Sequence, residues 1–383
     1  MVIETNRDLA EFCKKLEEAP ALFIDTEFVG EGRYYPEVGA IQVAAAGNIA
    51  LLDPIAITNF APLQKLLLDA KIEKVFHSAN QDLAILYRMM GRPVAPIFDT
   101  QIAAAILGYE GQISFGQLVE RVTGTALKKS HSFTDWLQRP LSPKQIEYAL
   151  EDVHYLAPVH ESQILELKSR KRISWAREEF SKLEDAARYL PDDPREVFRQ
   201  IRGAERLHGK ELAFLQELAA WREETARETN SPTQRVCMDG VLMELSRRPR
   251  KTLEELEVIR GLRPPQVKRF GAGLLEALRK GAEATPPTIA RSPYVPAELE
   301  PTVDFLVLCL RSLAATNNIS SSLLASRADL AAVALLGEKA NVSLMRGWRK
   351  KAVGEALLKT LQGKAVARIL PDTHQVHLEW NED

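Results

Sequence analysis

The sequence lacks the cysteine patterns that mark disulfide frameworks and zinc sites. Its 383 residues include three cysteines, Cys13, Cys237 and Cys309, which are odd in number and far apart in the chain. We therefore expect free thiols in a reducing compartment and predict no zinc site.

Long hydrophobic runs are also missing. No run approaches the ~18 apolar residues that a membrane-spanning helix needs, and the first residues, MVIETNRDLAEFCKKLEEA, lack a basic region followed by an apolar core. We expect a cytoplasmic protein without a membrane partner. The nearest approach to a P-loop, GTALKKS at 124–130, lacks the second glycine, so no ATP site is expected there and the stretch is interpreted as a polar connection.

A large excess of charge of one sign is missing as well, since the formal net charge is −2. The charges are nevertheless unevenly distributed. Residues 1–167 carry 14 Lys and Arg against 22 Asp and Glu, whereas residues 168–283 carry 25 against 20. An acidic first part beside a basic second part is typical of a metal-loaded site next to a phosphate-binding region, with chance asymmetry as the alternative.

The composition is ordinary for a soluble globular protein, with 45% hydrophobic and 27% charged residues, and the length predicts two or three domains. The first part alternates apolar runs with helical patterns, which predicts a mixed α/β fold with a sheet covered by helices. The rest is nearly all helical, and proline clusters mark its boundaries. The predicted division is 1–167 (α/β domain), 168–194 (connecting helix or linker), 195–284 (helical domain), 285–301 (proline-rich linker) and 302–383 (second helical domain).

Two carboxylates stand one residue apart in LFIDTEF, residues 22–28. Side chains of a strand alternate between its faces, so Asp25 and Glu27 are expected on the same side of a sheet. Two like charges in one small site raise a pKa, recruit a cation or lie in open water, and the apolar neighbours argue against open water. A strand that simply ends in a solvated turn is the alternative.

Two further acidic positions follow along the chain. In FHSANQDLAIL a strand is expected to end before a helix that Ser78 or Asn80 caps and whose first turn holds Asp82. In PKQIEYALEDVHYL, Tyr148 and Asp152 are four residues apart, which places both on one face of a helix.

Taken together and in this order, these residues resemble the DEDD exonucleases with a tyrosine in the last motif, and specifically the ribonuclease D family. The segments DTEFVGEGRYYPEVGAIQV, IFDTQIAAAILG and HSFTDWLQRPLSPKQIEYALEDVHYL look like ribonuclease D segments. WREETARETNSPTQRVCMDGVLMELSRRPRKTLEELEVIRGL resembles an HRDC domain, and two stretches near the C-terminus, NNISSSLLASRADLAAVALL and LMRGWRKKAVGEALLKTL, resemble the family's second, HRDC-like domain. The fold implied is an RNase H-like exonuclease domain followed by two small helical domains.

The resemblance implies hydrolysis of phosphodiesters with two divalent ions, Mg²⁺ or Mn²⁺, for which carboxylates supply hard oxygen ligands. It implies that Asp25 bridges the ions, that Glu27 and Asp152 complete the first site, and that Asp82 acts at the second. Tyr148 is then expected to orient the attacking water, because a phenol with a pKa near 10 is a poor base. The implied reaction trims the 3′ ends of structured RNAs such as tRNA precursors and releases nucleoside 5′-monophosphates.

Other residues are candidates for contacts with the RNA. Phe28 can stack on a base and Gln42 can hydrogen-bond a base edge or sugar, although both can equally be packing residues. A basic stretch offers phosphate contacts, with a solvated turn as the alternative. Its candidate residues are Arg247, Arg248, Arg250 and Lys251.

Two polar residues near the motifs are given structural roles instead. His77 follows a strand and is interpreted as a structural hydrogen-bonder rather than a catalytic residue. Asp99 is interpreted as a helix N-cap or a neighbouring first-turn carboxylate rather than a metal ligand.

Two other functions stay open at this point. A DNA 3′ exonuclease needs the same metal chemistry, and a catalytically silent RNA-binding scaffold needs none of it.

Overall fold

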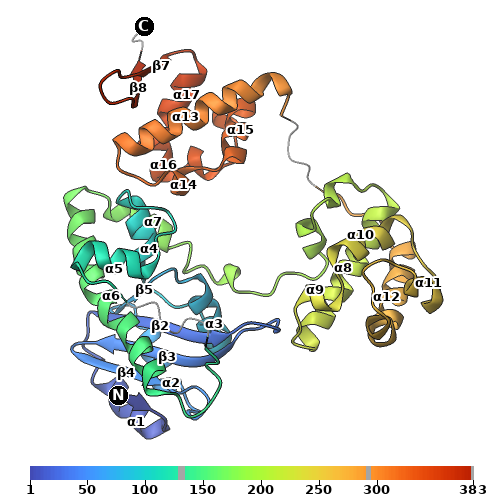
Figure 1. Cartoon of the computed structure of the whole chain (residues 1–383), viewed down its shortest axis with the longest axis horizontal. Coiled ribbons are helices and arrows are strands. Elements are labelled where there is room, and N and C mark those ends of the chain that lie inside the picture. The colour runs from blue at the N-terminus through green and yellow to red at the C-terminus, as the bar shows by residue number, and fades with distance from the viewer. Residues whose placement is uncertain (128–133, 290–294, 381–383) are drawn as a thin grey trace. The chain divides into compact units, whose positions relative to one another are not determined.

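The computed structural model describes residues 1–127, 134–289 and 295–380, so the GTALKKS segment ends outside the described residues. The chain forms two compact units (Figure 1). The first, the sheet unit, comprises Met1–Glu27, Val38–Tyr189 and Pro293–Asp383. The second, the helical unit, comprises Phe28–Glu37 and Leu190–Ser292.

Six strands form a mixed sheet in the order β1-β4-β3-β2-β5-β6. β1 pairs in parallel with β4, and β5 pairs in parallel with both β2 and β6, whereas β3 and β4 are antiparallel. The predicted mixed α/β fold is confirmed. The strands are β1 (Val2–Ile3), β2 (Ala21–Val29), β3 (Glu37–Ala45), β4 (Asn48–Leu52), β5 (Glu73–Phe76) and β6 (Ile97–Asp99).

Helices cover both faces of this sheet (Figure 1). On one face, α1 (Asn6–Lys14), α2 (Ala61–Leu67) and α3 (Asn80–Met90) bury apolar side chains against Leu22 and Ile24 of β2. On the other face, Phe23 of β2 packs into a core with the helices α4 (Thr100–Ile106), α6 (Pro143–Ser169) and α7 (Ile173–Phe180). α5 (Phe115–Thr123) packs beside α4 and α6. The alternation along β2 therefore directs its odd-numbered residues toward α6.

Side chains cap the starts of α1, α4, α5 and α6, whereas α2, α3 and α7 have no side-chain cap. Ser142 caps α6 through a capping box with Gln145, and Asp99 caps α4 by accepting hydrogen bonds from two backbone N–H groups, as predicted. The predicted cap of α3 by Ser78 or Asn80 is wrong, because its N-cap residue is Ala79 and makes no side-chain cap. The Asp99 carboxylate accepts instead from the backbone N–H groups of Ser78 (3.3 Å) and Ala79 (2.9 Å).

The C-terminal part of the sheet unit, residues 295–380, has its own apolar core. Besides the expected helices it contains a terminal two-stranded hairpin of β7 (Ala365–Ile369) and β8 (Val376–Trp380). The helices are α13 (Glu300–Thr316), α14 (Ser321–Leu324), α15 (Arg327–Leu336), α16 (Gly347–Arg349), a π-helical turn (Lys350–Gly354) and α17 (Glu355–Leu361).

The helical unit is built around its own core, in which α8 packs against α10 and α12. Pro264 and Pro265 begin α12, where their fixed φ suits the first turn of a helix. The helices are α8 (Lys210–Glu228), α9 (Thr233–Val236), α10 (Asp239–Arg247), α11 (Leu253–Glu257) and α12 (Pro264–Glu283). In the described parts of the chain, no helix is both long enough and apolar enough to span a membrane.

One buried cation stabilises the turns beside β5. Lys74 is fully buried, and its ammonium group donates to the backbone carbonyls of Asp69 (2.8 Å), Ile72 (2.6 Å) and Ala95. An ammonium group has three donors, so all of them are used. Lys74 thereby joins the turn before β5 to the turn before β6.

Replacing Lys74 by methionine is expected to lower the free energy of unfolding by about 2 kcal/mol or more, because buried carbonyls lose their donor and each unsatisfied group costs ~1–3 kcal/mol. Chemical denaturation measures the change. Lys71→Met, at an exposed position three residues earlier, is the control and should stay within about 0.5 kcal/mol of the wild type. Equal losses in both variants would contradict the role of Lys74.

Candidate active site

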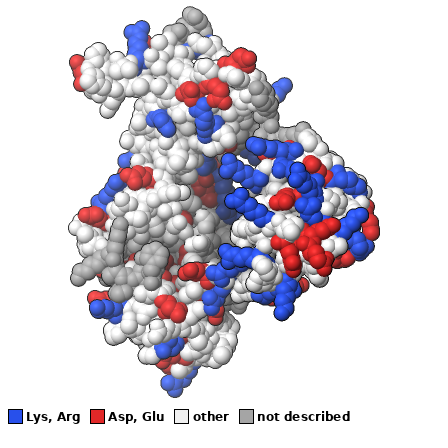
Figure 2. Space-filling model, turned by 45° about the vertical axis from the view of Figure 1, so that its right-hand side comes forward, with Lys and Arg blue, Asp and Glu red and all other residues white. Residues whose placement is uncertain are grey.

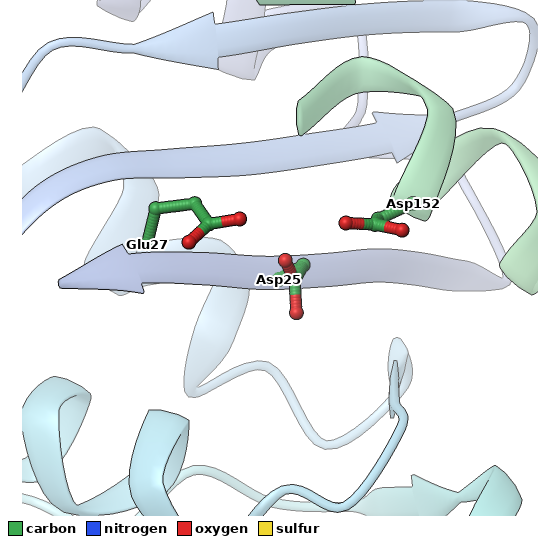
Figure 3. A group of neighbouring side chains, drawn as sticks. All are labelled: Asp25, Glu27 and Asp152. Carbon is green, nitrogen blue, oxygen red and sulfur yellow. The ribbon is translucent and has the colours of Figure 1, made fainter. Parts of the chain in front are cut away.

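Three carboxylates converge on the face of the sheet that α6 covers. Asp25 and Glu27 project from β2, and Asp152 reaches toward them from α6 (Figure 3). One carboxylate oxygen of each lies within 4.8 Å of the others, and all three residues are half-buried. The predicted placement of Asp25 and Glu27 on the same side of a strand is confirmed, and hard oxygen ligands at this spacing suit a divalent cation.

α6 brings Tyr148 to the same place. Tyr148 lies one turn before Asp152, and both line a cavity of about 230 Å³ together with Asp25 and Glu27. Ala149 and Val153, on the same helix, are fully buried, so the packed side of α6 fixes the direction of its polar side chains. The Tyr148 hydroxyl lies close enough to Asp152 to lower the pKa of that carboxyl against the effect of burial.

Asp82 lies near these carboxylates but outside the three-residue cluster. It is 6% exposed in the first turn of α3 and accepts a hydrogen bond from the Thr26 hydroxyl at 2.5 Å. Its charge is close enough to raise the pKa values of Asp25 and Glu27. Four carboxylates therefore share one electrostatic environment.

Burial is the largest cause of the raised pKa values in this group, and repulsion between the carboxylates adds to it. The pKa of Asp25 is raised well above its usual value by burial and then by Asp82, Asp152 and Glu27. Burial raises the pKa of Glu27 to about 8 and that of Asp152 to about 7. The pKa of Asp82 rises to about 6, again through burial and against the Thr26 hydrogen bond. A divalent cation would offset this repulsion, so the donor set fits a metal.

The pKa of Tyr148 is raised, like those of the carboxylates. Burial, followed by the charges of Asp152, Glu27 and Asp25, raises the pKa of Tyr148. The phenol therefore stays protonated near neutral pH and acts as a hydrogen-bond donor or acceptor rather than a base.

Two residues that the sequence did not assign to the site line the same cavity, His77 and Phe115. The Nε2 atom of His77 donates to the Ile113 carbonyl at 3.1 Å, and Nδ1 pairs with the Thr100 hydroxyl at 2.9 Å, which also contacts the Phe76 carbonyl at 3.1 Å. Burial lowers the pKa of His77, which keeps the ring neutral. His77 thus has the structural hydrogen bonds expected of it and also forms part of the cavity wall. Phe115 is the first residue of α5, directly after the capping residue Ser114, and no sequence motif pointed to its place in the cavity wall.

The predicted RNA-contacting residues lie elsewhere. Phe28 follows Glu27 on β2, where alternation directs its side chain away from the carboxylates. Gln42 on β3 is fully buried and does not line the cavity, and neither atom of its amide finds a hydrogen-bond partner among the described residues. The basic stretch joins α10 to α11 in the helical unit. Arg247, Arg248 and Lys251 are exposed, and Arg250 is half-buried.

Two family models match separate parts of the chain. A family model described as a 3′-5′ exonuclease matches residues 1–168, and one described as an HRDC domain matches residues 211–278. Exonucleases of this family depend on divalent metal ions, which agrees with the acidic cluster.

Similar proteins cover nearly the whole chain. It is 34% identical to the ribonuclease D of Sphingobium indicum over 95% of each chain. It is 33% identical to the ribonuclease D of Nitrobacter hamburgensis over 96% of this chain and 97% of the relative. The structure resembles the crystal structure of Escherichia coli RNase D, an exoribonuclease involved in structured RNA processing, with a TM-score of 0.85 and 32% identity, covering 95% of this chain and 98% of the other.

These matches confirm the resemblance inferred from the motifs and favour RNA over the DNA and scaffold alternatives. The chain therefore belongs to the ribonuclease D family and is a 3′-5′ exoribonuclease.

Proposed function

We propose that the protein trims the 3′ ends of structured RNAs such as tRNA precursors, with Asp25, Glu27, Asp82 and Asp152 as metal ligands. The observation that carries the proposal is the convergence of three carboxylates whose oxygens lie within 4.8 Å of one another beside Tyr148. Two ions, Mg²⁺ or Mn²⁺, would be held with Asp25 shared between them, Glu27 and Asp152 at one and Asp82 at the other. When bound, the metal supplies charge neutralisation and a water that loses its proton near neutral pH.

The chain's own residues orient the reacting groups in this proposal. The Tyr148 hydroxyl holds the attacking water by a hydrogen bond, because its raised pKa keeps the phenol protonated. Phe115 stacks on the base of the 3′-terminal nucleotide in the cavity that it lines. Attack at the last phosphodiester then releases a nucleoside 5′-monophosphate, and the shortened strand keeps a free 3′ hydroxyl.

The helical unit offers a surface for the body of the RNA. A hollow of about 590 Å³ is lined by Arg235, Arg263 and Arg269 together with Gln266 and Phe270. All three arginines are exposed, and Figure 2 shows many Lys and Arg side chains on the visible face of this unit. Because Pro264 and Pro265 at the start of α12 lack backbone N–H groups, phosphates would be bound here by side chains.

Asp25→Asn and Asp152→Asn are each expected to lower kcat by about a hundredfold or more, because each weakens the binding of a metal ion whose positive charge stabilises the transition state. The measurement follows a 5′-labelled RNA with a short 3′ overhang in Mg²⁺, Mn²⁺ or EDTA. The wild type should give a ladder that shortens from the 3′ end only with metal. RNA binding should be retained in both variants, and wild-type activity in either would refute the assignment.

Without metal, the protein should lose stability as pH rises from 5 to 9. Folding raises the pKa values of Glu27 to about 8 and Asp152 to about 7, so the folded state binds more protons than the unfolded state and stability falls with pH. Melting temperatures measured in EDTA test this, and added Mn²⁺ should restore more stability at pH 8.5 than at pH 5.5. Asp25→Asn should reduce the loss in EDTA, and a melting temperature that is flat or rises over this range would contradict the account.

Arg263→Glu combined with Arg269→Glu should weaken binding of a structured RNA by about tenfold or more and reduce its salt dependence, because two phosphate contacts are reversed in charge. Binding is measured in the Asp25→Asn background so that the RNA stays intact. Lys14→Glu with Lys15→Glu, which makes the same charge change at exposed positions at the end of α1, is the control. The pair Arg247→Glu and Arg248→Glu tests the basic stretch in the same assay. Equal weakening by the α1 control would show that only net charge matters.

A further inference from the structure

A buried ion pair joins the C-terminal part of the sheet unit to the exonuclease helices. The Glu179 carboxylate, on α7, accepts from Nη2 of Arg349 at 2.9 Å and from Nε1 of Trp348 at 2.8 Å. Glu179 and Arg349 are each 6% exposed. Trp348 also stacks on Trp175 of α7, with ring centroids 4.9 Å apart. The two parts therefore meet through a buried, hydrogen-bonded ion pair and two stacked indole rings, and Lys182 also pairs with Glu179 at 2.8 Å.

The junction extends to the C-terminal end of α4. The backbone N–H of Ser320 donates to the Ala105 carbonyl at 2.8 Å. Nη1 of Arg172 donates to the carbonyls of both Ile106 and Asn318, each at 2.8 Å. The last carbonyls of a helix have no partner within that helix, so these groups complete the end of α4.

The connection between α4 and α5 packs closely against residues 318–322 of the C-terminal part. Gly108 has a φ of +94°, and a Cβ there would lie 2.8 Å from the carbonyl carbon and oxygen of Asn318. A Cβ at Gly111 would lie 2.0 Å from the Ser322 hydroxyl oxygen. Glycine at both positions allows the two segments to approach closely.

The same connection ends in the wall of the candidate active site. The Ile113 carbonyl accepts from Nε2 of His77 and from Nε2 of Gln101, both at 3.1 Å. Two residues later, Phe115 lines the cavity and packs in the same apolar cluster as Leu323 of α14. A displacement of the connection therefore moves both His77 and Phe115.

We propose that residues 317–323 of the C-terminal part position the wall of the active-site cavity that His77 and Phe115 form. The inference rests on the proposed function, since that function assigns this wall to the 3′-terminal nucleotide. Asn318 and Ser320 are positioning residues, which act through Gly108 and the end of α4. The C-terminal part thus sets how tightly the RNA end is bound without touching the RNA itself.

Gly108→Ala tests the proposal in the full chain, because the added Cβ must displace Asn318. With a 5′-labelled tetranucleotide RNA, KM should rise by about tenfold, which is the effect expected when one base-stacking contact is lost. The kcat value should stay within about threefold of the wild type. Gly91→Ala is the matched control: its φ is +68°, but a Cβ there meets no atom within 4 Å. It also places an alanine at a positive φ, without the clash, and should leave KM unchanged. A KM that is equal in the two variants would overturn the proposal.

Combining Gly108→Ala with Phe115→Ala separates positioning from a general loss of stability. If Gly108 acts through Phe115, the double variant should have the same KM as Phe115→Ala alone, because the stacking contact can be lost only once. A KM that rises to the product of the two single effects would overturn the proposal. A wild type that leaves the RNA intact with metal would instead remove the proposed function, and this inference with it.

Discussion

The structure depends on the burial of several carboxylates at one place on a sheet. Like charges that are brought together away from water repel each other, and burial adds to the cost of ionising them. Asp25, Glu27 and Asp152 have their oxygens within 4.8 Å of one another, with the charge of Asp82 close by. Such an arrangement weakens the folded state at neutral pH, and a cation bound by the proposed ligands would offset this, so that metal binding and stability would be linked.

The surrounding strands and helices hold the carboxylates together against their mutual repulsion. β2 lies inside the sheet between β3 and β5, which fixes Asp25 and Glu27. α6 is capped by Ser142 and Gln145 and buries Ala149 and Val153, so Tyr148 and Asp152 face the strand. The cavity wall that His77 and Phe115 form is held less directly, through the connection after α4 and the C-terminal part that packs on that connection. The site therefore draws on segments from the start, middle and end of the sheet unit.

The sequence was most informative where one element determines the geometry. The period of two in a strand placed Asp25 and Glu27 on one side, and the period of a helix placed Tyr148 beside Asp152. It was less informative where contacts join distant segments. The cap of α3 comes from Asp99, nineteen positions beyond the helix start at Asn80. The role of Phe115 in lining the cavity arises only from tertiary packing, which no local pattern reports.

Mn²⁺ binding to crystals of the protein, located by anomalous scattering, tests the central claim most directly. The account predicts two metal peaks roughly 4 Å apart, as expected for a two-metal site. One peak should contact Asp25, Glu27 and Asp152, and the other should contact Asp25 and lie on the side of Asp82. A single peak away from these residues, or none at saturating Mn²⁺ and neutral pH, would contradict the account.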